Sequence, residues 1–338
     1  MVAISEAATY TPSITRVETT DVALGGNEVN VPNKQFKEIT DRTAYLKAEI
    51  DALKGDATAQ ATTAEFTQVG VASINQGRLS LVDNDPVGQA AGASTLYFAP
   101  YNGDYIAIYD TGNSRWELRQ FTQRSLDIGS LAANTNYDIF AHWDGDSVEL
   151  SAVVWANSGY GTSSRAVSLS RLNGIWINGS NSRRYLGTIR MTSVAGQCET
   201  SSINQFVWNA ANRISREMYV TQAVTYTFGA ASWRYANNST TAARVNLVVG
   251  LDNESTANVV ARLGLAFNAR GISVAIGQNS TSPLNHVAAQ PAQADADGSV
   301  EIARNISIPA GANFYNAIEF ADFVSDLRNP AVLVEGKF

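Results

Sequence analysis

The chain has 338 residues, of which 45% are apolar and only 16% are charged, whereas about 25% are charged in ordinary soluble proteins. This composition excludes a disordered chain, and it favours an extracellular or virion protein over a cytosolic enzyme. The net charge of −7, with no basic run longer than Arg183-Arg184, argues against nucleic acid as a partner and against a basic membrane-surface helix.

Residues 1–30 have neither a basic start nor a long apolar core, so we expect no secretory signal. Since no stretch of the chain approaches 18 uninterrupted apolar residues, we also expect no membrane insertion. Apolar and polar residues alternate loosely in this segment, which ends at Gly25-Gly26. This pattern indicates an extended attachment arm that lies on a neighbouring protein. A chain that has no secretory signal but has the composition of an extracellular protein is consistent with a component of a virus particle, because lysis of the cell releases the particle.

The next segment, residues 31–55, is predicted to be a helix. Pro32 or Asn33 opens it, and Gly55 closes it. The apolar positions are spaced three and four residues apart in alternation, which is a heptad row with one polar member. These positions are Phe36, Ile39, Thr43, Leu46, Ile50 and Leu53. A narrow apolar stripe needs a covering surface, which is either a second copy of the helix or a sheet of the same domain.

Residues 56–218 are predicted to contain a polar connector and then a β-rich body domain. From about residue 76 the sequence alternates with a period of two, and short turns separate the runs. Asn102-Gly103 is a strong hairpin signal, Asp144-Gly145 marks another turn, and a further turn falls at 179–182. This pattern predicts an antiparallel meander, with a short helical link or a bent strand at 207–218.

Residues 219–338 form a second β-rich region, in which Val245, Leu247 and Val249 are expected to share one face of a strand. The length and spacing of the runs predict a C-terminal β-sandwich or jelly roll. The fold class is therefore mainly β, preceded by the arm and one heptad-patterned helix.

Two stretches resemble proteins of bacteriophage tails. The helical segment is similar to a short element near the N-terminus of tail-fibre and baseplate proteins, since it carries Asn-Lys-Gln at 33–35, Asp-Arg-Thr at 41–43 and Tyr-Leu-Lys at 45–47. The body segment resembles a domain of phage and prophage fibre-like proteins. Its matching motifs are Leu96-Tyr97, Pro100-Tyr101, Tyr137 to Phe140, Arg183 to Thr188, Trp208-Asn209 and Asn212-Arg213.

This resemblance covers about residues 25–218 and implies a homotrimer that is attached by its N-terminus and exposes its C-terminus. The heptad row would then be the inner face of a three-helix bundle, and residues 1–55 would contact other tail or baseplate proteins. The implied location is the virion.

Few side chains point to catalysis or to a metal. Cys198 is the single cysteine and is expected to be a buried thiol, since one cysteine cannot form an internal disulfide. His142 is expected to be structural, and His286 has no Cys or His nearby with which to share a metal. We therefore expect no catalytic residue, no cofactor and no metal.

Three acidic clusters leave an alternative open. They are Asp83 with Asp85, Asp144 with Asp146 and Glu149, and Asp295 with Asp297. Paired carboxylates cleave glycosides or bind Ca²⁺, but these sequences are also typical of turns, which is the interpretation we favour.

Aromatic side chains are the better lead to a binding surface. Most of the six tryptophans fall in predicted strands and are expected in the core. Trp233 and Tyr235 lie near a polar loop and are the candidate receptor contacts, because exposed rings stack on sugars and anchor interfaces.

The sequence thus favours a non-enzymatic structural protein of a phage tail, either a fibre or a baseplate-attached adhesin, whose C-terminal domain contacts a glycan or protein on the host surface. The alternatives are a capsid decoration protein without a receptor role, a glycan depolymerase and a carbohydrate-binding module.

Overall fold

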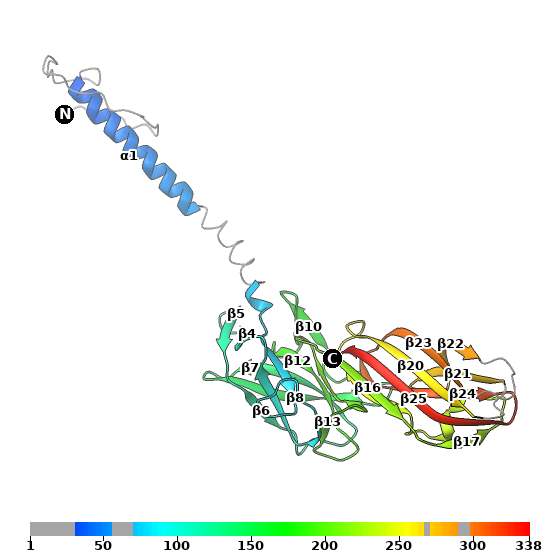
Figure 1. Ribbon diagram of the computed structural model, residues 1–338. Coiled ribbons are helices and arrows are strands. Elements are labelled where there is room, and N and C mark those ends of the chain that lie inside the picture. Colours follow the sequence, from blue (N-terminus) through cyan, green and yellow to red (C-terminus); the bar gives the residue numbers. More distant parts are fainter. Residues whose placement is uncertain (1–30, 56–69, 267–270, 290–297) are drawn as a thin grey trace. The chain divides into compact units, whose positions relative to one another are not determined.

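The computed structural model describes residues 31–55, 70–266, 271–289 and 298–338. The chain divides into two compact units, residues 1–68 and 69–338, which we call the helical unit and the β unit (Figure 1). The predicted arm at 1–30, and most of the connector after residue 55, lie outside the described residues. The β unit confirms the mainly β fold class.

The helical unit contains α1, which spans Val31–Gly55 as predicted. Pro32 stands in the first turn, where its missing N–H needs no partner, and long straight-chain residues favour the helix interior. Thr43, the polar member of the heptad row, donates its hydroxyl to the carbonyl of Ile39 at 2.9 Å. Among the described residues, no helix is both long and apolar enough to cross a membrane.

The first half of the β unit contains three sheets that are antiparallel within themselves. One sheet has the order β1-β3-β6, a second pairs β4 with β5, and the third has the order β10-β11-β12-β7-β8-β9 with β15 beside β12. Their bounds are β1 Gly77–Ser80, β3 Thr95–Pro100, β4 Tyr105–Asp110, β5 Arg115–Gln120, β6 Arg124–Asp127, β7 Asn136–Trp143, β8 Val148–Asn157, β9 Ser164–Arg165, β10 Leu169–Leu172, β11 Ile175–Asn178, β12 Arg184–Arg190 and β15 Val207–Asn209.

Two of the predicted turns join paired strands as expected. Asp144-Gly145 lies between β7 and β8, which pair in register from Tyr137 opposite Val154 to Trp143 opposite Val148. The turn at 179–182 connects β11 and β12, which are paired at Ile177 and Arg184. The segment at 207–218 is not helical, and it consists of β15, a bend and the start of β16.

The hairpin predicted at Asn102-Gly103 is wrong. The chain does turn there, but β3 pairs with β1 and β6, whereas β4 pairs with β5. Gln76 explains the difference, since its carbonyl accepts the backbone N–H groups of Tyr101 and Asn102. The turn is therefore stabilised by a distant segment, and the two flanking strands enter different sheets.

The second half of the β unit is a sandwich, as predicted. One sheet has the order β2-β13-β14-β19-β24-β21-β22, with β18 beside β24, and the facing sheet has the order β16-β25-β20-β23, with β17 beside β25. Their bounds are β2 Ala90–Ala93, β13 Cys198–Thr200, β14 Asn204–Gln205, β16 Ser215–Thr221, β17 Thr225–Phe228, β18 Arg234–Tyr235, β19 Arg244–Val249, β20 Thr256–Leu265, β21 Ile272–Gln278, β22 Pro283–Ala289, β23 Gly298–Ser307, β24 Gly311–Ala321 and β25 Ser325–Lys337.

A large apolar core lies between these two sheets. Val245, Leu247 and Val249 of β19 are fully buried in it, as expected, together with Val259 of β20 and Val332 of β25. The short 3₁₀ helix Ala236–Asn238 follows β18. Burial of this set of branched side chains drives the two sheets together.

The two halves of the β unit share strands and a core. β14 pairs in parallel with β19, so residues of both halves lie in one sheet. The expected boundary at residue 218 falls inside β16, which pairs with β25 along its whole length. Arg78 of β1 donates to the carbonyl of Phe338 at 3.2 Å. Residues 69–338 therefore form one compact unit.

Candidate functional site

The heptad row of α1 is the first candidate site. Ile39, Leu46 and Ile50 are 47%, 58% and 50% exposed, and Thr43 is exposed as well. Phe36 and Leu53 lie on the same helix, but their side chains are outside the described part of the chain. Three large apolar groups at heptad spacing thus lack a cover within the described residues, and such a row is typical of a helix that packs on other helices.

The candidate receptor contacts are Trp233, which directly precedes β18, and Tyr235 of β18; both are partly buried and pack against β24. The Trp233 ring packs on Phe320 with centroids 5.5 Å apart, and the Tyr235 ring packs edge-on against Phe314 at 6.4 Å. The residue between them, Arg234, binds the buried carboxylate of Glu319 at 2.7 Å. The structure therefore packs both rings against the same strand, β24, and gives each of them a packing role; their receptor role stays a prediction.

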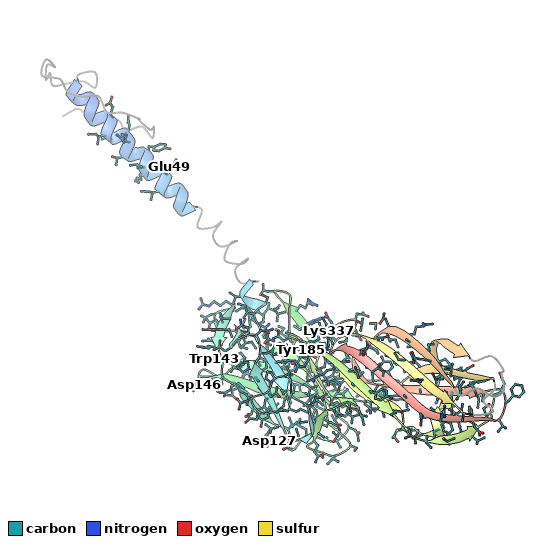
Figure 2. The ribbon with its side chains drawn as sticks, viewed as in Figure 1. Glu49, Asp127, Trp143, Asp146, Tyr185 and Lys337 are labelled. Carbon is teal, nitrogen blue, oxygen red and sulfur yellow. The ribbon has the colours of Figure 1, made fainter. Side chains whose placement is uncertain are left out.

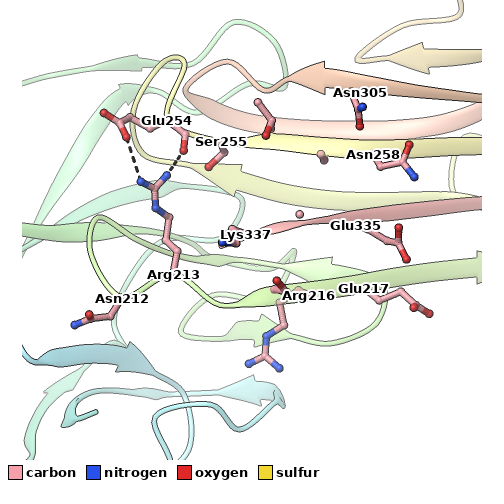
Figure 3. Close-up of a pocket in the computed structure, with 14 residues that line it drawn as sticks. Asn212, Arg213, Arg216, Glu217, Glu254, Ser255, Asn258, Asn305, Glu335 and Lys337 are labelled. Carbon is pink, nitrogen blue, oxygen red and sulfur yellow. Dashed lines mark hydrogen bonds and ion pairs between the residues drawn. The ribbon is translucent and has the colours of Figure 1, made fainter. Parts of the chain in front are cut away.

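A polar groove of about 1,060 Å³ lies on the outer face of the sheet β16-β25-β20-β23 (Figure 3). The strand register sets Glu217 opposite Glu335, Glu335 opposite Asn258, and Asn258 opposite Asn305. Four polar side chains thus form one row across four strands, because facing residues of neighbouring strands point to the same side. The sequence did not single out this row, since its four members follow one another at intervals of 30 to 47 residues along the chain.

The ends of the groove differ in charge. Arg213 closes one end through an ion pair with Glu254 at 3.1 Å, drawn in Figure 3, and it also donates to the backbone carbonyl of Glu254. Lys337 lies near the end of β25 (Figure 2) and lines the same groove as the row (Figure 3). Glu217 and Glu335 are both exposed and face each other on adjacent strands, where like charges are unfavourable. Amides and carboxylates in this arrangement suit a hydroxyl-rich or cationic ligand.

A second hollow of about 590 Å³, which we call the indole hollow, lies between β8, β9, β10, β11 and the loops before β20 and β24. Its lining includes Trp155 and Trp176, and a guanidinium covers each ring. Arg165 lies 4.4 Å from the ring centre of Trp155, and Arg171 lies 4.2 Å from that of Trp176. Glu254 lines both the polar groove and the indole hollow.

A buried polar network supports one wall of the indole hollow. Asp138 of β7 accepts from Arg165 at 2.6 Å and from the Thr188 hydroxyl at 2.6 Å. Arg165 also donates to the carbonyl of Gly250, which links the two halves of the β unit. Burial acts to lower the pKa of Arg165, but the hydrogen bonds and the charge of Asp138 outweigh burial, so the net pKa is raised.

Tyr185 completes this network, and Figure 2 labels it within the β unit. Its hydroxyl and that of Thr188 are 2.6 Å apart. Complete burial, and then the nearby charge of Asp138, raise the pKa of Tyr185 well above its usual value. The tyrosine therefore stays protonated and holds the arginine in place.

In each of the two acidic clusters that the structure describes, one aspartate makes hydrogen bonds of the kind found in turns. Asp144 Oδ1 accepts the backbone N–H groups of Asp146 and Ser147, and these bonds lower the pKa of Asp144. Asp85 similarly accepts from the N–H of Val87 at 3.0 Å. The cluster of Asp295 and Asp297 lies outside the described residues.

The remaining candidates of the sequence are Cys198, His142 and His286. Cys198 is buried and free, as expected, and burial raises the pKa of its thiol to about 12. Burial lowers the pKa of His142, whose imidazole is partly buried beside β8. The side chain of His286 is outside the described part of the chain. Within that part, no group of three or more His, Cys, Asp or Glu side chains is placed to hold a metal.

Comparison with known proteins gives only remote likenesses. No family model matches the chain, and no curated protein matches it. Among solved structures, an insecticidal delta-endotoxin of Bacillus thuringiensis is 8% identical with a TM-score of 0.25, and the match covers 77% of this chain and 51% of that one. The chain thus spans about half the length of that endotoxin.

Two further structures come from complexes with sugars. A protein in complex with neoagarooctaose is 10% identical with a TM-score of 0.22, and the match covers 73% of this chain and 32% of that chain. An exo-β-1,3-galactanase from Phanerochaete chrysosporium is 13% identical with a TM-score of 0.19, and the match covers 77% and 68%. At these scores the likenesses carry no conclusion about this chain.

Proposed function

We propose that this chain is a non-enzymatic structural protein of a phage tail, a fibre or a baseplate-attached adhesin, that acts as a homotrimer anchored by its N-terminal region. The observation that carries the proposal is the uncovered heptad row of α1, in which Ile39, Leu46 and Ile50 are about half exposed. The first set of motifs shared with tail proteins, at 33–35, 41–43 and 45–47, adds support because it falls in the same helix.

The free energy gained by burying the heptad row favours association of the α1 helices only together with other contacts. Complete burial of one Ile or Leu side chain contributes about 1.5–3 kcal/mol, and each of the three described side chains is already half covered. A helix of 25 residues is about 38 Å long, which is short for an independent coiled coil. The bundle would therefore depend on further contacts with neighbouring chains or with the particle.

In this proposal the sandwich contacts the host surface, and its polar groove supplies hydrogen-bonding groups for a glycan or a protein. Three weak sites on one trimer gain avidity, because the second and third contacts form at a high effective concentration. Trp233 and Tyr235 stay candidate contacts of the same domain.

The alternatives make different predictions for the same molecule. A capsid decoration protein would form its assembly without binding host material. A depolymerase would use paired carboxylates, of which Glu217 and Glu335 are the facing pair that the structure provides. A carbohydrate-binding module would bind sugar without forming a trimer. A falling viscosity of polysaccharide solutions, lost in Glu217→Gln, would establish the depolymerase.

The experiment compares the whole chain with the variant Leu46→Glu/Ile50→Glu on a panel of bacterial cells and extracted surface polysaccharides. The proposal expects the natural chain to be retained on at least one member, with retention at least about 100-fold weaker for the variant because avidity is lost. Equal retention of both forms, or no retention on any member, would contradict it.

A further inference from the structure

The turn between β24 and β25 carries the two most exposed large apolar side chains that the structure describes in the β unit. It consists of Asp322, Phe323 and Val324, and we call it the apical turn. Phe323 is 57% exposed and Val324 is 72% exposed, although β24 before them is buried along nearly its whole length. Single exposed apolar residues are common, but two neighbours at the point of one turn present a continuous apolar surface.

The fold supports this exposed turn from behind. The backbone N–H of Asp322 donates to the carbonyl of Gly271 at 3.1 Å. A Cβ atom at Gly271 would lie 3.2 Å from the Phe323 ring, and one at Gly229 would lie 2.7 Å from Val324. Glycine therefore lets the backbone segments next to β17 and β21 approach the turn closely. The turn is held in place, and more than half of the surface of Phe323 and Val324 stays in water.

The apical turn lies at the end of the sandwich that is remote from the first half of the β unit (Figure 1). β25 begins directly after the turn at Ser325, and its other end leads to Phe338, which accepts a hydrogen bond from Arg78 of β1. Thirteen residues of extended strand measure about 43 Å, at about 3.3 Å per residue. The apolar surface is thus presented at the distal end of the sandwich.

The charges beside the turn are negative. Asp322 is exposed within the turn, and Asp326 of β25 is partly exposed, with its carboxylate accepting the Thr227 hydroxyl at 2.9 Å. Arg234 of the nearby β18 is neutralised by the buried carboxylate of Glu319. A partner of the turn therefore needs an apolar region whose border attracts carboxylates or at least does not repel them.

A zwitterionic lipid bilayer meets these requirements better than a protein. The two apolar side chains expose on the order of 200 Å², whereas a standard protein interface buries about 800 Å² on each partner. A protein would also need a pocket shaped for a convex turn, whereas acyl chains adapt to a protruding side chain. The ammonium groups of zwitterionic lipids suit Asp322 and Asp326, and anionic headgroups would repel both carboxylates.

We propose that the apical turn is a contact for a zwitterionic membrane surface, in which Phe323 and Val324 enter the headgroup region and Asp322 faces lipid ammonium groups. Apolar and aromatic side chains bind bilayer interfaces in this way, and the binding strengthens with the apolar area that is buried. The carbonyl of Phe323 already accepts the hydroxyl of Ser325 at 3.2 Å, so it keeps a partner when water is displaced.

The inference goes beyond the proposed function, which assigns host contact to a glycan or a protein. The contact uses a turn at the bilayer surface and needs no spanning segment. It therefore differs from the membrane insertion that the sequence argues against.

The test measures how the whole chain partitions onto sedimenting vesicles of phosphatidylcholine and phosphatidylethanolamine. The natural chain should bind saturably, and Phe323→Ser/Val324→Ser should lower the partition coefficient by at least about 10-fold, because apolar burial is lost. Val194→Ser is the matched control, since Val194 is 52% exposed between β12 and β13. It should bind as the natural chain does. All three proteins should unfold at the same temperature, because the changed side chains are exposed.

A second series of vesicles tests the charge. Replacing half of the lipid by phosphatidylglycerol should weaken partitioning at low ionic strength, because the carboxylates of the turn are repelled. Asp322→Asn should reduce this loss.

The proposal is overturned if the natural chain stays in solution with every vesicle, if Phe323→Ser/Val324→Ser binds as the natural chain does, or if binding requires phosphatidylglycerol. The vesicles contain neither glycan nor protein. Their result is therefore separate from the experiment on cells and polysaccharides, which tests the proposed function.

Discussion

The helical unit and the β unit differ in how far their apolar side chains are buried. In the β unit, most of the large apolar side chains are buried in cores that are built from strands far apart in the sequence. In α1, the described apolar members of the heptad row are about half exposed. The β unit therefore has what it needs to fold as a single chain, whereas the helix needs a surface that the described part of the chain does not supply.

The largest effect should come from charges in the heptad row. We expect Leu46→Glu/Ile50→Glu to abolish the oligomer. Association would bury carboxylates at two positions of the heptad row, and moving a carboxylate out of water costs more free energy than leaving it exposed in the monomer. The thermal midpoint of the β unit should stay the same. Sedimentation and thermal unfolding measure the two quantities on one sample.

Lys47→Glu is the control for that variant, since Lys47 is an exposed residue of α1 outside the row. It should leave the oligomer intact. An unchanged oligomer in Leu46→Glu/Ile50→Glu would show that the row is not the interface.

Within the β unit, the next effect should come from Asp138. We expect Asp138→Ala to lower the free energy of unfolding by about 3–5 kcal/mol, because the largely buried Arg165 would lose its counter-charge. Urea unfolding measures the change. Arg115→Ala is the comparison, since this exposed arginine pairs with Glu117 at the surface and should contribute about 1 kcal/mol or less.

A smaller loss is expected where the two halves of the β unit meet. A Cβ atom at Gly250 would lie 2.0 Å from the Tyr185 hydroxyl and 2.4 Å from the Trp208 ring. Gly250→Ala should therefore lower the free energy of unfolding by about 1–3 kcal/mol. Gly298→Ala meets no atom within 4 Å and should be close to neutral. Equal effects of the two changes would contradict the close packing at Gly250.

The smallest effect concerns pH. Burial raises the pKa of Glu319 above its ordinary value of 4.5, although Tyr226 and Arg234 act in the opposite direction. The folded state thus holds this proton more tightly than the unfolded chain. The resulting stabilisation is complete below about pH 4.5 and is lost as the pH rises through the raised folded pKa.

Glu319→Gln isolates this contribution, because other carboxylates titrate in both proteins. The unfolding free energy of the natural chain minus that of the variant should fall as the pH rises from about 4 towards 8. A difference that rises over this range would mean that the pKa of Glu319 is lowered by folding.

The sequence alone predicted those elements that depend on residues close together along the chain. The heptad spacing and the end residues Pro32 and Gly55 predicted α1 with its correct bounds, and Asp144-Gly145 predicted a turn between paired strands. Asn102-Gly103 predicted a hairpin that does not form, because the flanking strands β3 and β4 pair with β1 and β5 and not with each other. Local turn chemistry sets where the chain reverses but does not set which strands pair.

The central strand β24 was missed for a related reason. It is buried along nearly its whole length and includes Asn313, Asn316 and Glu319, so no polar and apolar alternation marks it. The indole hollow escaped notice as well, because it joins Trp155 and Trp176 to Asp252 across the fold. Tertiary contacts alone bring these residues together, and a single sequence does not display them.

The most direct measurement is the mass of the whole chain in solution, by light scattering after size exclusion. The account predicts about 109 kDa, three times the chain mass of 36.2 kDa, and a return to one chain mass in Leu46→Glu/Ile50→Glu. A natural chain that elutes with the mass of one copy at every concentration would contradict self-association through α1.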